Sequence, residues 1–176
     1  MADFILLWAH VLSLAVFFGS GVTMLITFLP VASKLKNTDE CQSYLSQGLK
    51  YYNPLSIGSL GLLLMTGAWK LTSFKSTPGL SFFTPEGSLS EFGGLLGTKL
   101  LLVFLLINVS AAVSLGMGHR LVRTEIRGER FPPEKLPGLV KRIQVFTIIA
   151  LLLTGSVVWL SLDMSRLRIL VSLAGT

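Results

Sequence analysis

The stretch 3–21, "DFILLWAHVLSLAVFFGSG", begins a long apolar run. After Asp3, no charged residue occurs until Lys34. This uncharged run exceeds the roughly 20 apolar residues that a transmembrane helix needs. It also differs from a typical cleavable signal peptide, which has a basic start and a shorter apolar core. His10 interrupts the run, and its ring nitrogens need polar partners in hydrocarbon.

The composition is that of a membrane protein. Of 176 residues, 51% are hydrophobic and 14% are charged, and the mean hydropathy is +0.69. Soluble domains carry about 25% charged residues. The net charge of +6 reflects basic cytoplasmic loops better than nucleic-acid binding, so we expect the lipid bilayer, and no nucleic acid, as a partner. The single cysteine, Cys41, excludes an internal disulfide.

Three more apolar stretches predict three more membrane spans. Together the four spans cover about 4–32, 52–74, 92–119 and 142–163. The predicted fold is therefore all-α, an integral membrane four-helix bundle that forms a single membrane domain over 1–176. The loop 75–91 is expected to be a connector.

Basic residues divide unequally between the two sides of this bundle. Ten of them lie on the side that holds the loops 33–51 and 120–141. They are Lys34, Lys36, Lys50, Arg120, Arg123, Arg127, Arg130, Lys135, Lys141 and Arg142, which directly follows the second loop. The opposite side carries four: Lys70, Lys75, Arg166 and Arg168. The excess makes the first side cytoplasmic and places both termini outside the cytoplasm, as expected for a protein of a bacterial inner membrane. The tryptophans then lie at the non-cytoplasmic interface, where such residues are enriched: Trp8, Trp69 and Trp159.

A rise of 1.5 Å per helical residue places one group of polar residues at a common depth, roughly 10–12 Å from the non-cytoplasmic side. This layer consists of His10, Thr66, Lys99, Thr154 and Ser156. His10 is either a hydrogen-bonded helix contact or a ligand of haem iron or another metal. Lys99 either extends to the membrane surface or meets an anionic ligand or relays a proton. His119 lies roughly 30 Å beyond Lys99 along the helix, so the two histidines are not expected to share an iron.

The second and fourth spans share a motif. "LLLMTGAWKL" (62–71) and "LLLTGSVVWL" (151–160) both place Thr-Gly shortly before Trp. The motif indicates either a duplicated two-helix unit or convergence on a common membrane composition, and the sequence leaves both open.

Four segments resemble the helices of two membrane protein families. "HVLSLAVFFGSG" (10–21) resembles the first helix of the copper resistance protein D (CopD) domain and of the HemJ-type protoporphyrinogen oxidases. "EFGGLLGTKLLLVFLLINVSAAVSLGMGHRLVR" (91–123) resembles the third helix of both. "YYNPLSIGSLGLLLMTGAWKL" (51–71) and "KRIQVFTIIALLLTGSVVWL" (141–160) resemble the other two, so the likeness covers nearly the whole chain.

The resemblance implies a cofactor and a role. By analogy with HemJ, His10 is the ligand of a b-type haem and Lys99 is the family lysine, which we expect to meet a propionate. The implied function is electron transfer, or a redox step on a porphyrin-like substrate, with a redox partner on the periplasmic side. HemJ proteins carry further histidines where this chain has Gly97 and Ser110, so enzymatic activity stays open.

Two alternatives remain at this stage. By analogy with CopD, the protein handles copper in the periplasm, with His10 as a metal ligand. Copper sites favour several Met and His residues, whereas the five Met here do not cluster. The other alternative is a bundle without a cofactor that serves as a small subunit of a larger membrane complex.

Overall fold

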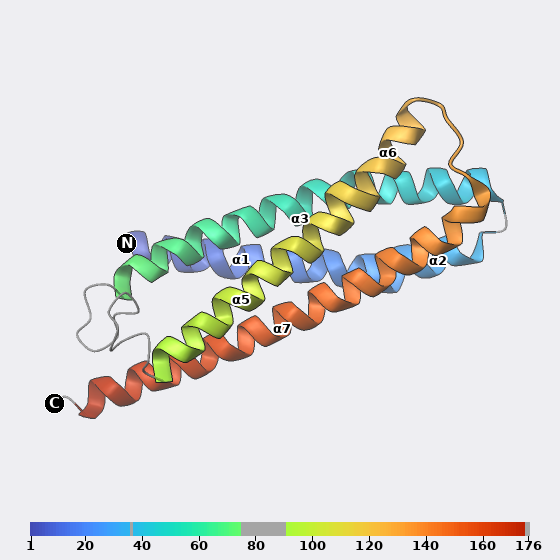
Figure 1. The fold of residues 1–176 in the computed structure, drawn as a ribbon. Helices are drawn as coiled ribbons and strands as arrows, with labels where there is room; N and C mark the ends of the chain where they lie inside the picture. The colour runs from blue at the N-terminus through green and yellow to red at the C-terminus, as the bar shows by residue number, and fades with distance from the viewer. Residues whose placement is uncertain (36, 75–90, 175–176) are drawn as a thin grey trace.

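The computed structural model describes residues 1–35, 37–74 and 91–174, which form four long helical rods (Figure 1). The first rod runs through α1 (Ala2–Thr23), the π-helical segment η1 (Met24–Phe28) and α2 (Leu29–Lys34). The second is α3 (Thr38–Phe74). The third runs through α5 (Glu91–Ala111), the π-helical segment η2 (Ala112–Gly118) and α6 (His119–Ile126). A 3-10 turn, η3 (Pro133–Lys135), leads into the fourth, α7 (Leu136–Ala174). The described residues contain no strand, which confirms the all-α prediction.

Three helical stretches are long and apolar enough to cross a membrane. They are Phe4–Lys34, Phe92–Ile126 and Pro133–Arg166. Each contains one of the predicted spans, so the structure agrees with a membrane protein. The remaining predicted span, 52–74, belongs to α3, whose 37 residues begin with a more polar half.

The rods form two antiparallel pairs. Helix α1 packs along α3, and α5 packs along α7. The pairs lie together at the end that carries α2 and α6, and they diverge toward the end that holds the N-terminus and the end of α7 (Figure 1). The loop 75–90 lies outside the described residues, so the prediction of a connector there is not addressed.

The number of buried core residues differs from one end of the bundle to the other. At the converging end, twelve buried residues form one cluster: Met24, Leu29, Ala32, Cys41, Leu45, Leu49, Tyr52, Val113, Leu121, Leu136, Val140 and Ile143. A middle cluster has four: Phe17, Leu60, Leu106 and Ala150. A third cluster, near the diverging end, has three: Phe92, Leu96 and Met164. The two pairs are thus joined mainly at the end remote from the termini.

A buried glutamine fastens the connector between α6 and η3 to α3. The Gln42 side-chain amide donates to Glu125 Oε2 at 2.9 Å and to the Glu129 carbonyl at 3.0 Å. Its carbonyl oxygen accepts the Phe131 N–H at 2.8 Å. These three bonds satisfy most of the bonding capacity of the amide, which explains how a polar side chain is buried here.

Cys41, next to this glutamine, is a core residue. Its thiol donates to the Ala32 carbonyl, with a sulfur–oxygen distance of 3.3 Å. Burial raises the pKa of the Cys41 thiol. The thiol therefore stays protonated at neutral pH and is a poor nucleophile.

Candidate functional site

Helices α1 and α3 bring His10 and Thr66 into direct contact. His10 Nδ1 lies 2.7 Å from Thr66 Oγ1. Thr66 is 3% exposed, and His10 is partly buried. A Cβ built on Gly67 would lie 3.9 Å from His10 Cε1, so the imidazole lies against the Thr-Gly pair of the repeated motif. Two residues of the predicted layer are therefore neighbours, although 56 positions separate them in the chain.

The hydrogen bonds of Thr66 indicate which ring nitrogen of His10 carries the proton. Thr66 Oγ1 lies 2.7 Å from the Leu62 carbonyl, to which its hydroxyl donates. A hydroxyl has a single hydrogen, so Thr66 accepts from His10, and Nδ1 of a neutral His10 carries the proton. The Nε2 lone pair is then free, and no described residue donates to it. A metal-bound histidine has the same arrangement, since its other ring nitrogen donates to a fixed acceptor.

The helical repeat explains why these side chains face the interior. On the first rod, His10 and Phe17 of α1 and Met24 of η1 recur every seven residues, which keeps them on one face. Phe17 and Met24 are buried in the middle and converging-end clusters. On α5, Lys99 precedes the buried Leu106 by seven residues. His10 and Lys99 therefore each lie two helical turns beyond a residue of the middle cluster, toward the diverging end.

Two lysines lie near the imidazole. The charges of Lys70 and Lys99 both act on His10, and the charge of Lys70 also acts on Lys99. Lys70 follows Thr66 by four residues, hence one turn along the same face of α3. Within the described residues, neither lysine forms an ion pair with a carboxylate. The site is thus cationic, and its chemistry favours an anionic group beside His10.

Lys70 was not among the site residues predicted from the sequence, where it appears only as one of the four basic residues on the non-cytoplasmic side. The signal that identifies it is its spacing from Thr66, because residues four apart share a helix face.

Thr154 and Ser156 lie on different faces of α7. Thr154 is buried and donates to the Ala150 carbonyl at 2.7 Å. Ser156 is exposed and donates to the Leu152 carbonyl at 3.0 Å. A step of two residues rotates a helical position by about 200°. The structure therefore buries Thr154 in the bundle and leaves Ser156 exposed on another face of α7.

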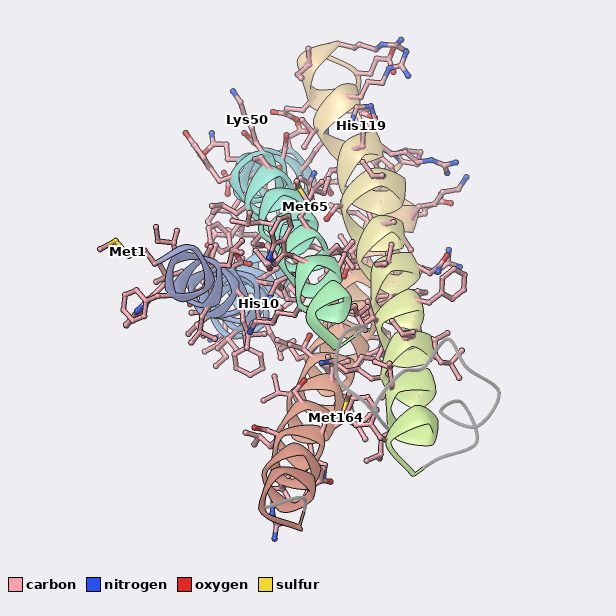
Figure 2. The ribbon with its side chains drawn as sticks, turned by 90° about the vertical axis from the view of Figure 1, so that its left-hand side faces the viewer. Met1, His10, Lys50, Met65, His119 and Met164 are labelled. Carbon is pink, nitrogen blue, oxygen red and sulfur yellow. The ribbon has the colours of Figure 1, made fainter. Side chains whose placement is uncertain are left out.

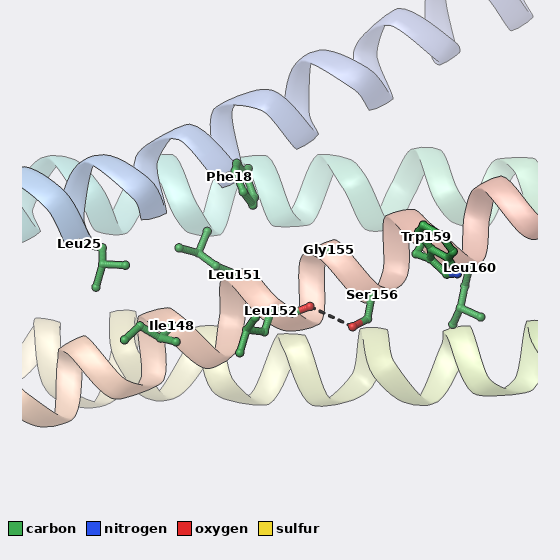
Figure 3. A pocket seen from close by; sticks show the side chains of 9 residues that line it. All are labelled: Phe18, Leu25, Ile148, Leu151, Leu152, Gly155, Ser156, Trp159 and Leu160. Carbon is green, nitrogen blue, oxygen red and sulfur yellow. Dashed lines mark hydrogen bonds between the residues drawn. The ribbon is translucent and has the colours of Figure 1, made fainter.

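Ser156 lines an apolar groove between α1 and α7, where the two helix pairs diverge (Figure 3). The groove has a volume of about 690 Å³. Its lining comprises Phe18, Leu25, Ile148, Leu151, Leu152, Gly155, Ser156, Trp159 and Leu160. Apart from Ser156 the walls are apolar, and His10 is not part of them.

The second histidine and the methionines lie elsewhere. His119 is exposed at the start of α6, which lies toward the end of the bundle remote from the N-terminus (Figure 1). Figure 2 shows His10 and His119 on different helices. Met65 neighbours Thr66 in sequence but is 73% exposed. Over the described residues, no three side chains of His, Cys, Asp or Glu group closely enough to hold a metal ion.

Comparison with known proteins finds no family model, no curated protein and no solved structure that matches this chain.

Proposed function

We propose that this chain is an integral membrane protein that binds one haem b, and that His10 Nε2 would hold the iron. The hydrogen bond between His10 Nδ1 and Thr66 Oγ1 carries the proposal, since it leaves Nε2 free and fixes the ring. A haem supplies four of the iron's ligands itself, so one protein histidine suffices on that face. When bound, haem supplies one-electron redox chemistry.

The lysines supply the charge that such a group requires. Lys99 pairs with a propionate or another acidic group. This pairing offsets the cost of placing the lysine charge inside the bundle. Thr66 holds the imidazole in one tautomer. The proposed role is electron transfer, or a redox step on a porphyrin-related substrate, with a redox partner on the periplasmic side.

An absorption spectrum of the purified full chain tests the proposal. We expect a Soret band, and α and β bands that appear on reduction. Bound copper without these bands would favour periplasmic copper handling. A colourless, metal-free protein from haem-replete cells would favour a cofactor-free subunit of a larger complex, and either result would overturn the haem proposal.

We further propose that the converging end faces the cytoplasm of a bacterial inner membrane and that both termini lie outside it. The ten-to-four division of basic residues supports this orientation. The N-terminus and the end of α7 lie at the same end of the bundle, as four spans require (Figure 1).

Reporter fusions test the orientation. We expect alkaline phosphatase to be active when fused after Thr176 and inactive when inserted in the loop 124–138. Green fluorescent protein should give the reverse pattern, because it folds in the cytoplasm. A cytoplasmic C-terminus would contradict the orientation and would move His10 to the cytoplasmic half of the membrane.

Thr66→Val tests the role of the hydroxyl. Valine has nearly the same shape but cannot accept a hydrogen bond, so Nδ1–H of His10 loses its partner. Loss of the hydrogen-bond partner of a metal ligand costs about 10–100-fold in affinity. We expect a weakening of this size in a haem titration of the apoprotein. Thr66→Ser is the matched control and should retain the affinity, whereas equal weakening in both variants would show that the hydroxyl is not the cause.

A further inference from the structure

Four buried polar atoms between α3 and the third rod have no hydrogen-bond partner in the described part of the chain. They are Asn53 Oδ1, Ser56 Oγ, Ser110 Oγ and Ser114 Oγ, and we call them the polar seam. Ser56 and Ser114 are each 1% exposed. Helix α3 packs directly on η2, so these residues come from two adjoining rods. Such atoms require an explanation, since nearly all buried polar groups in proteins are paired.

The geometry at Gly118 shows that the two rods meet closely at the seam. A Cβ on Gly118 would lie 2.8 Å from Asn53 Oδ1 and 3.1 Å from the Val113 carbonyl. The Asn53 side chain therefore points at the backbone of η2. Ser114 precedes Gly118 by four residues, and Ser110 precedes Ser114 by four, so the serines extend from this contact along the third rod. Ser56 lies one turn beyond Asn53 on α3.

The seam serines differ from the other hydroxyls of the bundle. Ser13, Ser59, Thr147 and Thr154 are equally buried, and each donates to the carbonyl four residues earlier in its own helix. A serine in a membrane helix has that acceptor close by. Ser110 and Ser114 leave it unused. The π-helical segment η2 covers Ser114, and such segments are frequent at functional sites.

The hydrogen-bonding type of the unpaired atoms indicates which ligand they can bind. A hydroxyl needs an acceptor for its hydrogen, and an amide oxygen needs a donor. A cation would bind the lone pairs but would leave the hydroxyl hydrogens unpaired. A water molecule both donates and accepts, and buried waters typically make about three hydrogen bonds. Tyr52 lies four residues before Ser56 on α3, and its phenol lies beside the Ser56 side chain and adds a further polar group.

We infer that the polar seam is a binding site for ordered water, which joins α3 to η2 inside the bundle. Each bound water accepts from one or two of the serine hydroxyls, and the water beside Asn53 donates to its Oδ1. It thereby links the first helix pair to the second beside the converging-end cluster. This inference does not depend on a haem at His10.

Thermal unfolding of serine variants in detergent tests the site. Ser114→Ala removes a partner of the water, and we expect the midpoint to fall by about 2–4 °C. Ser59→Ala is the matched control, because its hydroxyl bonds its own helix, and it should shift the midpoint by less than about 1 °C. An unchanged or raised midpoint for Ser114→Ala would overturn the inference, since removing a hydroxyl that truly lacks a partner relieves a cost.

Two further measurements keep the inference testable if a variant fails to insert. Hydroxyl-radical footprinting of the wild type should label Tyr52 strongly despite its burial, because water lies beside it. Phe17, buried in the apolar middle cluster, should stay unlabelled. Equal protection of both rings would overturn the site. A midpoint that rises in sodium chloride but not in choline chloride would also overturn it, in favour of a cation.

Discussion

His10→Ala protein is expected to insert and fold normally but to retain little haem. Alanine suits a membrane helix, and His10 lies outside the three buried clusters, so the loss of its side chain leaves the packing intact. The variant removes the ring nitrogen that faces away from Thr66. Haem per polypeptide, measured by pyridine haemochrome, should fall by at least about tenfold, because even indirect ligand changes have effects of that size.

The chain offers a matched control for this experiment. His119→Ala removes the other histidine, which is exposed on α6 at the far end, and it should leave haem content and spectrum unchanged. Lys99→Met should lower the haem content less than His10→Ala, because it removes a charge partner and not an iron ligand. A full haem complement with an unaltered spectrum in His10→Ala would show that the iron has other ligands.

A protein that never binds haem or metal would leave His10 with a different role. The imidazole would then be a hydrogen-bonded contact between α1 and α3. Its bond to Thr66 is sufficient for that role, since one buried hydrogen bond contributes about 0.5–1.5 kcal/mol. His10→Ala would in that case change only the stability of the first helix pair.

The repeated motif corresponds to a repeated structure. In both helix pairs, the threonine of the motif is buried and donates to the carbonyl four residues earlier. In both, the tryptophan that follows is exposed. His10 lies against the first threonine, and Lys99 has the corresponding place in the first helix of its own pair, one heptad from the middle cluster. These features agree with a duplicated two-helix unit and equally with convergence on a common membrane composition, because Thr66 and Trp69 are three residues apart whereas Thr154 and Trp159 are five apart.

Sequence reasoning predicted the helices because their signal is local. Long uncharged runs define the rods, and depth follows from counting residues along a helix, which is how His10 and Thr66 were placed together. The direction in which a side chain points around its helix axis is harder to predict from sequence. Ser156 and Thr154 lie at a similar depth but on different faces of α7. The pairing of Gln42 with the connector depends on chain reversals that no local pattern records. The polar seam was missed for the same reason, because an unused hydroxyl is recognised only from its neighbours.

Most buried core residues lie at the converging end, so we expect truncations there to destabilise the bundle most. Leu45 is 0% exposed in the twelve-residue cluster, where α2, α3, α6 and α7 meet. Truncating a fully buried leucine to alanine costs about 2–5 kcal/mol, because apolar contacts are lost and a cavity remains. In a chain of this length, Leu45→Ala should lower the unfolding midpoint on the order of 10 °C.

Leu101→Ala is the matched control, since Leu101 is 58% exposed on α5 and its truncation leaves no enclosed cavity. Its midpoint should stay within about 2 °C of the wild type. Haem content at low temperature should be the same in both variants, because His10 lies at the diverging end, away from Leu45. If Leu45→Ala instead released haem while folded, the converging-end cluster would have to be coupled to the histidine site. If both leucine variants lost equal stability, the contacts that hold the two helix pairs together would not lie mainly in the converging-end cluster.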